Sequence, residues 1–139
     1  MTLQRPRPPS MEERQLQAKI KIAKNLTLVW SRVKANVAKE AKTDADKEDR
    51  KALKKFFKTF DEGLTPKLKA VESAKDGPGY TKAVNAALVV VRSYQTKMDN
   101  GPGLKAAHKV GLDAILDNIE DILEGKKTSM ENGPVDALK

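Results

Sequence analysis

Glycine and proline divide this chain into a few long stretches, and this division limits the fold more than any other feature of the sequence. Neither residue occurs between Ser10 and Lys42. The turns DGPG at 76–79 and NGPG at 100–103 frame another stretch, and Gly125 closes a third. Because glycine and proline commonly mark helix ends, we expect long helices joined by short turns.

The first stretch has the period of an α-helix from residue 10 to about residue 42. Ser10 and Glu13 fit a capping box, in which each side chain satisfies a backbone donor near the other. Apolar residues then recur at intervals of three and four, with Trp30 at the edge of the stripe. The stripe consists of Ile22, Leu26, Val29, Val33 and Val37.

A second long helix is predicted to begin near Thr43, where acidic residues suit the positive end of the helix dipole. Its apolar stripe crosses Gly63 and Pro66 without a change of phase, which favours one kinked helix over two separate helices. Pro66 would remove the hydrogen bond to the carbonyl of Glu62 and bend the helix there. The stripe consists of Leu53, Phe57, Phe60, Leu64, Leu68 and Val71.

Two shorter helices are expected to follow. The third lies between the two GPG turns, where a glycine would provide a left-handed cap for the preceding helix and a proline would prevent its continuation. Its core face contains Tyr80, Val84, Ala87, Val91, Tyr94 and Met98, widened by Leu88, Val89 and Val90. The fourth runs from about Leu104 to Glu124, and Gly125 ends it. Its core face contains Leu112, Ile115, Leu116, Ile119, Ile122 and Leu123.

The predicted fold class is all-α, since no segment alternates with the period of a strand. Short turns favour an up-down-up-down four-helix bundle with two long N-terminal helices, the second kinked near Gly63 and Pro66, and two shorter C-terminal helices. Residues 1–9, rich in proline and arginine, are expected to form a flexible arm. The bundle would span residues 10–125. Residues 126–139 would form a loose C-terminal tail, although residues 135–138 could dock.

Charge is distributed unevenly along the chain, which carries 27 basic and 19 acidic residues. A helical projection places basic residues opposite the core stripe of the first helix: Arg14, Lys21, Lys24, Arg32 and Lys39, with the apolar Leu28 among them. The second helix carries Lys47, Lys51, Lys54, Lys55 and Lys58 away from its core. The fourth helix has an acidic outer face of Asp113, Asp117, Glu120, Asp121 and Glu124. Each face is therefore a candidate interaction surface.

Four interpretations of these faces are open. They could be solvated surfaces that keep the protein soluble. The acidic face of the fourth helix could pair with the basic rim of the first, because these helices are neighbours in an up-down bundle. The acidic face of one copy could meet the basic face of another. Finally, the basic faces could bind nucleic acid or acidic lipid.

The usual arrangements of nucleophile, base and metal ligands found in enzymes are missing. The chain has no cysteine and a single histidine, His108, which excludes disulfides, thiolate zinc sites, a cysteine nucleophile and a paired-histidine metal site. We expect His108 to lie at a helix cap or on the surface. The GPG turns lack the third glycine of a dinucleotide-binding motif and the Gly-Lys-Ser/Thr of a P-loop. No catalytic residue, cofactor or metal is expected, and the protein is predicted not to be an enzyme.

The leading hypothesis is a non-enzymatic interaction or assembly module. It would bind a partner protein, or self-associate, through its charged outer helix faces. The alternative is an electrostatic binder of nucleic-acid backbone or acidic phospholipid, non-specific and salt-sensitive, that uses the basic faces of the first two helices. No small-molecule substrate is expected. The sequence shows neither a signal-peptide core nor an apolar run of membrane-spanning length, so the predicted location is cytoplasmic.

Overall fold

The computed structural model describes residues 10–39, 43–99, 104–136 and 138, and in this part of the chain it is all-helical. The prediction of an all-α fold class is therefore confirmed. The described residues form one helix more than expected. The helices are α1 (Met11–Val37), α2 (Asp44–Glu72), α3 (Gly77–Asp99), α4 (Ala106–Leu123) and the short α5 (Asn132–Asp136).

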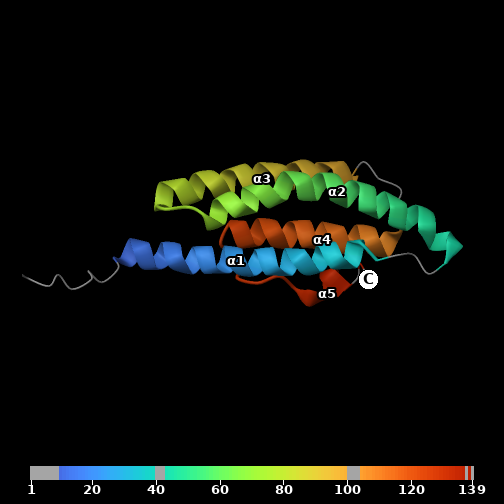
Figure 1. Ribbon diagram of the computed structural model, residues 1–139, viewed down its shortest axis with the longest axis horizontal. Helices are drawn as coiled ribbons and strands as arrows, with labels where there is room; N and C mark the ends of the chain where they lie inside the picture. The colour runs from blue at the N-terminus through green and yellow to red at the C-terminus, as the bar shows by residue number, and fades with distance from the viewer. Residues whose placement is uncertain (1–9, 40–42, 100–103, 137, 139) are drawn as a thin grey trace, which may run out of the picture.

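Helices that follow one another in the sequence pack against one another in space. Contacts join α1 to α2, α2 to α3, α3 to α4 and α4 to α5. In Figure 1, α2 and α3 lie above α1 and α4, and α5 lies on the lower side, where it contacts both α1 and α4. The apolar stripes of the four long helices meet between these layers and form one core.

Helix α1 begins where expected, and among the described residues one bond of the predicted capping box is present: the Ser10 hydroxyl accepts a hydrogen bond of 3.2 Å from the backbone N–H of Glu13. Trp30 lies deeper than predicted. It is only 1% exposed, and its ring stacks on Phe57 and meets Phe60 edge-on. The core of the α1–α2 interface is therefore aromatic, which gives α1 a fixed rotation about its own axis.

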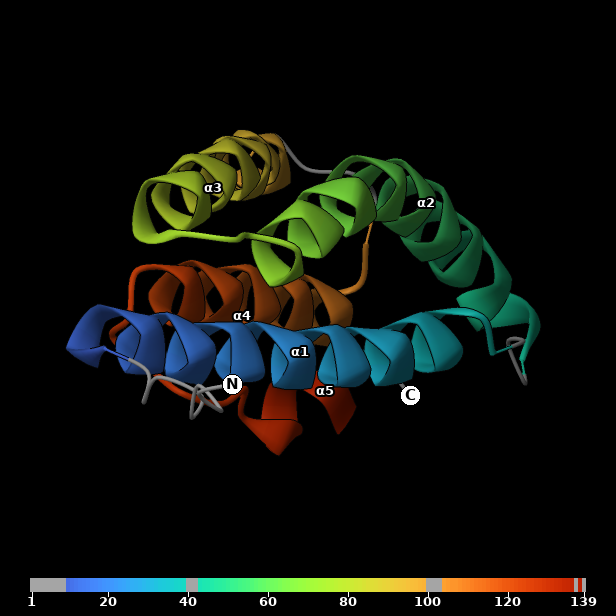
Figure 2. The same cartoon turned by 60° about the vertical axis from the view of Figure 1, so that its left-hand side comes forward.

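Helix α2 runs without interruption through Gly63 and Pro66, which confirms the prediction of a single helix. Figure 2 shows that this helix is curved along its length. Every residue of its predicted apolar stripe is buried. Burial of a continuous stripe on both sides of Pro66 compensates for the backbone hydrogen bond that the proline cannot donate.

The first GPG turn has a different role from the one predicted. Helix α2 has already ended at Glu72, and Gly77 is the first residue of α3. The Asp76 carboxylate caps α3 by accepting a hydrogen bond of 2.7 Å from the Gly79 N–H. Proline is tolerated in a first helical turn because its missing N–H would have no partner there. This GPG therefore starts a helix and does not stop one; the second, at 100–103, lies outside the described residues.

Val89 corrects the predicted core face of α3. It was expected to widen that face, but it is 67% exposed, whereas Leu88 beside it is buried. The helical period explains the difference, since Val89 follows Leu88 by about 100° of rotation and so points away from α2 and α4.

The end of α4 agrees with the prediction. Gly125 follows the helix with a φ of 82°, the left-handed conformation that glycine adopts without strain.

The C-terminal segment, expected to be a loose tail, packs against the bundle over its described residues. Met130, Val135 and Leu138 are buried, and α5 lies on α4 and α1. Asn36 donates a side-chain hydrogen bond of 2.9 Å to the carbonyl of Val135. These apolar residues complete the core on the side where α1 and α4 meet, which is the physical reason that the segment docks.

Candidate functional site

The outer face of α1, defined here as Arg14, Lys21, Lys24, Leu28, Arg32 and Lys39, is exposed as the helical projection predicted. Leu28 is 66% exposed in the middle of this face. The rotation of α1 is set by Trp30 and Val33, which are buried on the opposite side. The side chain of Leu28 is thereby held in water among the cations of this face.

The cations of this face have no acidic partners among the residues that the structure describes. Lys34 provides the contrast, because it lies at the edge of the α1–α2 interface and its ammonium is 3.1 Å from the Asp61 carboxylate. No comparable ion pair is formed by Lys21, Lys24 or Arg32 within the described residues. Their charge is therefore available to a partner.

A hollow of about 280 Å³ lies beside this face, between α1 and the segment that follows α4. Asn25, Val29 and Arg32 line it from α1, while Thr128 and Met130 line it from the C-terminal segment. Arg32 belongs to both the hollow and the outer face of α1. The surface around Leu28 is consequently not flat but has a depression at its edge.

The basic face of α2 differs from that of α1 in lacking an apolar centre. Lys47, Lys51, Lys55 and Lys58 are exposed and Lys54 is half-buried. Lys47 pairs with Asp44 at 2.7 Å. The large apolar side chains that are exposed in the described residues are Met11, Leu28, Val89 and Val110, and none of these belongs to α2.

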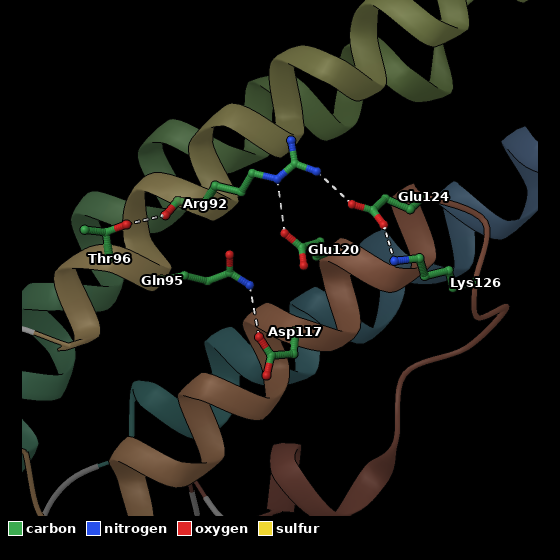
Figure 3. Close-up of polar contacts among 7 residues, drawn as sticks. All are labelled: Arg92, Gln95, Thr96, Asp117, Glu120, Glu124 and Lys126. Atoms are coloured by element: carbon green, nitrogen blue, oxygen red, sulfur yellow. Dashed lines mark hydrogen bonds and ion pairs between the residues drawn. The ribbon is translucent and has the colours of Figure 1, made fainter.

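In the residues that the structure describes, Asp117, Glu120 and Glu124 of α4 contact α3, and not the first helix, whose pairing with the acidic face was one of the open interpretations. Figure 3 shows the Arg92 guanidinium of α3 between Glu120, at 3.2 Å, and Glu124, at 2.7 Å. Asp117 accepts a hydrogen bond of 3.0 Å from the Gln95 amide. The sequence pattern showed that these acids share a face, but only the packing angle between α3 and α4 decides which helix that face meets.

Lysines of the C-terminal segment lie close to further acidic residues of α4. Lys126 lies 2.7 Å from the second carboxylate oxygen of Glu124. Hydrogen bonds from Lys126 and from Arg92 lower the pKa of the Glu124 carboxyl below its usual value. The Lys127 ammonium contacts Asn118 at 2.8 Å and Glu131 at 3.2 Å, and lies 4.0 Å from Asp121. Asp113, the remaining member of the predicted acidic face, is half-buried.

His108 was expected at a cap or on the surface, and it is instead 1% exposed. Its Nδ1 contacts the Asp49 carboxylate of α2, whose other oxygen accepts a hydrogen bond from the backbone N–H of Lys105. Burial lowers the pKa of His108, and Lys105 and Arg50 act in the same direction, against the opposite effect of Asp49. The helical spacing contained a signal for this burial, since His108 precedes the core residue Leu112 by four positions.

Arg50, next to Asp49, is buried as well and connects three parts of the chain. One of its guanidinium nitrogens donates to the carbonyl of Asn36, at 3.1 Å, and to that of Leu138, at 3.0 Å. The cluster of Asn36, Asp49, Arg50 and His108 therefore joins α1, α2, α4 and the C-terminal segment. Because each of these residues is 8% exposed or less, the cluster offers no access to a substrate.

Comparisons with protein-family models, with curated proteins and with solved structures found no match to this chain. In the residues that the structure describes, no group of three or more acidic or histidine side chains is placed to hold a metal ion. Nor does any helix in these residues have both the length and the apolar content that crossing a bilayer requires.

Proposed function

We propose that this protein is a non-enzymatic binding module that recognises an acidic partner protein through the outer face of α1. The proposal includes an up-down-up-down arrangement of the four long helices, which would serve as a rigid support for that face. The observation that carries it is the exposed Leu28 among cations that have no acidic partner within the described residues.

Leu28 favours a protein partner over a nucleic acid. Protein interfaces combine an apolar centre with a polar, charged rim, and a few central side chains supply most of the binding energy. Lys24 and Arg32 lie one helical turn on either side of Leu28 and would form such a rim. The phosphate backbone of a nucleic acid offers no apolar surface against which Leu28 could pack.

The ion pairs of α4 favour a different protein over a second copy of this chain. If two copies associated through opposite charges, the acidic face of α4 in one copy would have to meet the basic face of α1 in the other. However, Glu120 and Glu124 already form ion pairs with Arg92, and Asp117 accepts a hydrogen bond from Gln95. A second copy would have to displace these contacts. A separate acidic protein would meet the basic face of α1 without that cost.

Photo-crosslinking in cells tests this proposal with a matched control. A crosslinking amino acid would replace Leu28 in one variant and Val89 in the other; both residues are exposed to a similar extent, 66% and 67%. We expect a discrete adduct from position 28 only, and its loss when Lys24 and Arg32 are changed to glutamate. Equal adducts from positions 28 and 89, or an adduct that persists after the charge reversal, would contradict the proposal.

A second candidate function rests on the basic face of α2, where no large apolar side chain is exposed. A surface of Lys51, Lys55 and Lys58 without an apolar centre suits nucleic-acid backbone or acidic lipid, which bind through charge alone. Retention on DNA and on acidic vesicles should then fall steeply with salt. The triple glutamate variant at these lysines should abolish retention, while Leu28→Glu should leave it unchanged; retention of the triple variant would rule this candidate out.

A further inference from the structure

A second hollow, of about 480 Å³, opens between α1, α3 and the C-terminal end of α4. Its volume lies in the range of about 300–1,000 Å³ that is usual for small-molecule sites. The hollow exists because α1 and α3 lie on opposite sides of α4, and α4 ends at Leu123, whereas α1 extends further (Figure 1). Near this end, the space between α1 and α3 has no helix to fill it.

The floor of this hollow is apolar. Four of its side chains are at most 6% exposed, and the half-buried Ile22 of α1 completes it. The four are Val84 and Leu88 of α3 and Ile122 and Leu123 of α4. A hydrocarbon chain placed on this floor would have the side that faces the floor removed from water, which is favourable in proportion to the apolar area covered.

The rim of the hollow carries a positive charge that no acid in the described residues neutralises. The Lys19 ammonium lies 5.5 Å from the centre of the Tyr80 ring. The carboxylate at the rim, Glu124, is already held by Arg92 and Lys126, as Figure 3 shows. The other lysine of the rim, Lys127, is engaged by Glu131. Lys19 is therefore the cation that remains for a ligand.

Tyr80, whose ring lies near the Lys19 ammonium, also lines this hollow and carries a phenol hydroxyl that can donate a hydrogen bond. Burial raises the pKa of its hydroxyl, so the phenol keeps its proton at neutral pH. Both residues also line an adjoining hollow of about 600 Å³ along the first turns of α1. That hollow is bordered by three carboxylates, of Glu12, Glu13 and Asp76, and besides Lys19 by one further cation, Lys75, so its balance of charge disfavours an anion. An anionic group is thus favoured at the junction of the two hollows, with its hydrocarbon chain on the apolar floor.

We propose that this site binds a single-chain amphiphile with an anionic headgroup, such as a fatty carboxylate. The headgroup contacts the Lys19 ammonium and the Tyr80 hydroxyl, and the chain lies against Val84, Leu88 and Ile122. Lys19 is not part of the outer face of α1, so the headgroup of the amphiphile and the acidic partner protein of the proposed function contact different side chains. Either activity can therefore be present without the other.

The experiment is an NMR titration of the full chain with dodecanoate below its micelle concentration. Two probes isolate the features of the site: dodecyltrimethylammonium has the same chain with the opposite charge, and butanoate has the same headgroup with a short chain. We expect saturable binding of dodecanoate, with amide shifts concentrated at Tyr80, Val84, Leu88 and Ile122, and much weaker binding of both other probes.

Two variants distinguish a specific contact of the headgroup with Lys19 from attraction by the positive net charge of the protein. K19M keeps the aliphatic stem and removes the charge, and should weaken dodecanoate binding about tenfold, the usual effect of losing one charge-assisted contact. K21M removes a neighbouring charge on the outer face of α1 and should change binding less than about twofold. Circular dichroism verifies that both variants keep the helical fold.

Several results would overturn the inference. These are equal affinity for the cationic probe, equal effects of K19M and K21M, or shifts spread over the surface without saturation. Binding to phosphatidylglycerol vesicles without binding of monomeric dodecanoate would do the same, because it would assign the anion contact to a membrane surface.

Discussion

The indole N–H of Trp30 donates a hydrogen bond of 2.8 Å to the carboxylate of Asp61, across the interface between α1 and α2. The same carboxylate accepts a hydrogen bond of 2.7 Å from the Thr65 hydroxyl and lies 3.1 Å from the Lys34 ammonium. Trp30 is almost fully buried, so Asp61 supplies the polar partner that its indole needs inside the core. Asp61 thus fixes the position of the largest core side chain.

Replacing Asp61 with alanine should destabilise the protein by about 1–3 kcal/mol, because a buried N–H would lose its partner. Urea denaturation measures the change. Lys67→Ala, at an exposed position of the same helix, is the control and should shift the free energy of unfolding by less than about 0.5 kcal/mol. Equal effects of the two substitutions would show that the indole does not depend on Asp61.

Asp61 should also contribute to acid sensitivity. Burial favours a higher pKa, but hydrogen bonds from Thr65, Trp30 and Lys34 outweigh it and lower the pKa of Asp61 below 3.8. The folded state then binds the proton less readily than the unfolded state. The stabilisation is complete above pH 3.8 and is lost as the pH falls toward the folded-state pKa. Asp61→Asn should flatten the pH dependence of unfolding in this acid range, and an unchanged profile would contradict the assignment.

His108 should make stability depend on pH in a higher range. Its pKa is lowered from 6.5 by burial, so the unfolded chain takes up a proton before the folded protein does. Stability should therefore fall as the pH drops below 6.5, until the folded-state pKa is passed. Denaturation at about pH 7 and about pH 5.5 tests this expectation. His108→Gln, which cannot titrate, should lose less stability between the two; a loss equal to that of the parent protein would assign the effect elsewhere.

The buried Leu138 gives a test of the C-terminal segment. Leu138 is 0% exposed, so Leu138→Ala should cost about 2–5 kcal/mol, as truncations of buried leucines do. Val110→Ala, at a residue that is 68% exposed, is the matched control and should cost less than about 0.5 kcal/mol. Thermal or urea denaturation distinguishes the two. A small effect of Leu138→Ala would mean that the segment does not contribute to the folded core in solution.

The glycines that begin α3 provide a paired prediction. A Cβ at Gly79 would lie 2.8 Å from a carboxylate oxygen of Asp76, whereas a Cβ at Gly77 would meet nothing within 4 Å. Gly79→Ala should therefore disturb the Asp76 cap and destabilise the protein by about 1 kcal/mol. Gly77→Ala should be neutral or stabilising, because it restricts the unfolded chain. The reverse order in denaturation experiments would refute the capping geometry.

Helical spacing was sufficient to predict the four long helices and most of the core. Leu53, Phe57 and Phe60 are buried because a stripe of period 3.6 must face another helix, and the constant phase of the stripe across Gly63 and Pro66 correctly indicated a single α2. The same projection correctly placed Leu28 in water. These properties depend on one helix at a time, so the sequence of that helix determines them.

The features that the sequence did not predict depend on how the helices are placed relative to one another. The meeting of Arg92 with Glu120 and Glu124 requires the packing angle of α3 on α4. The contact of His108 with Asp49 requires the register of α4 against α2. The hollow that contains Lys19 and Tyr80 depends on where three helices end relative to one another. Local periodicity carries no information about these relationships.

The hydrogen bond between Asn36 and Val135 joins residues that are 99 positions apart, whereas the helices of the core pack mainly on their neighbours in sequence. Contacts between sequence neighbours close short loops and form quickly, but this bond must wait until the rest of the chain has been brought together. The docking of the C-terminal segment is thus expected to be a late step of folding. Substitutions that weaken this docking, such as Asn36→Ala in α1, would then accelerate unfolding and leave the folding rate almost unchanged.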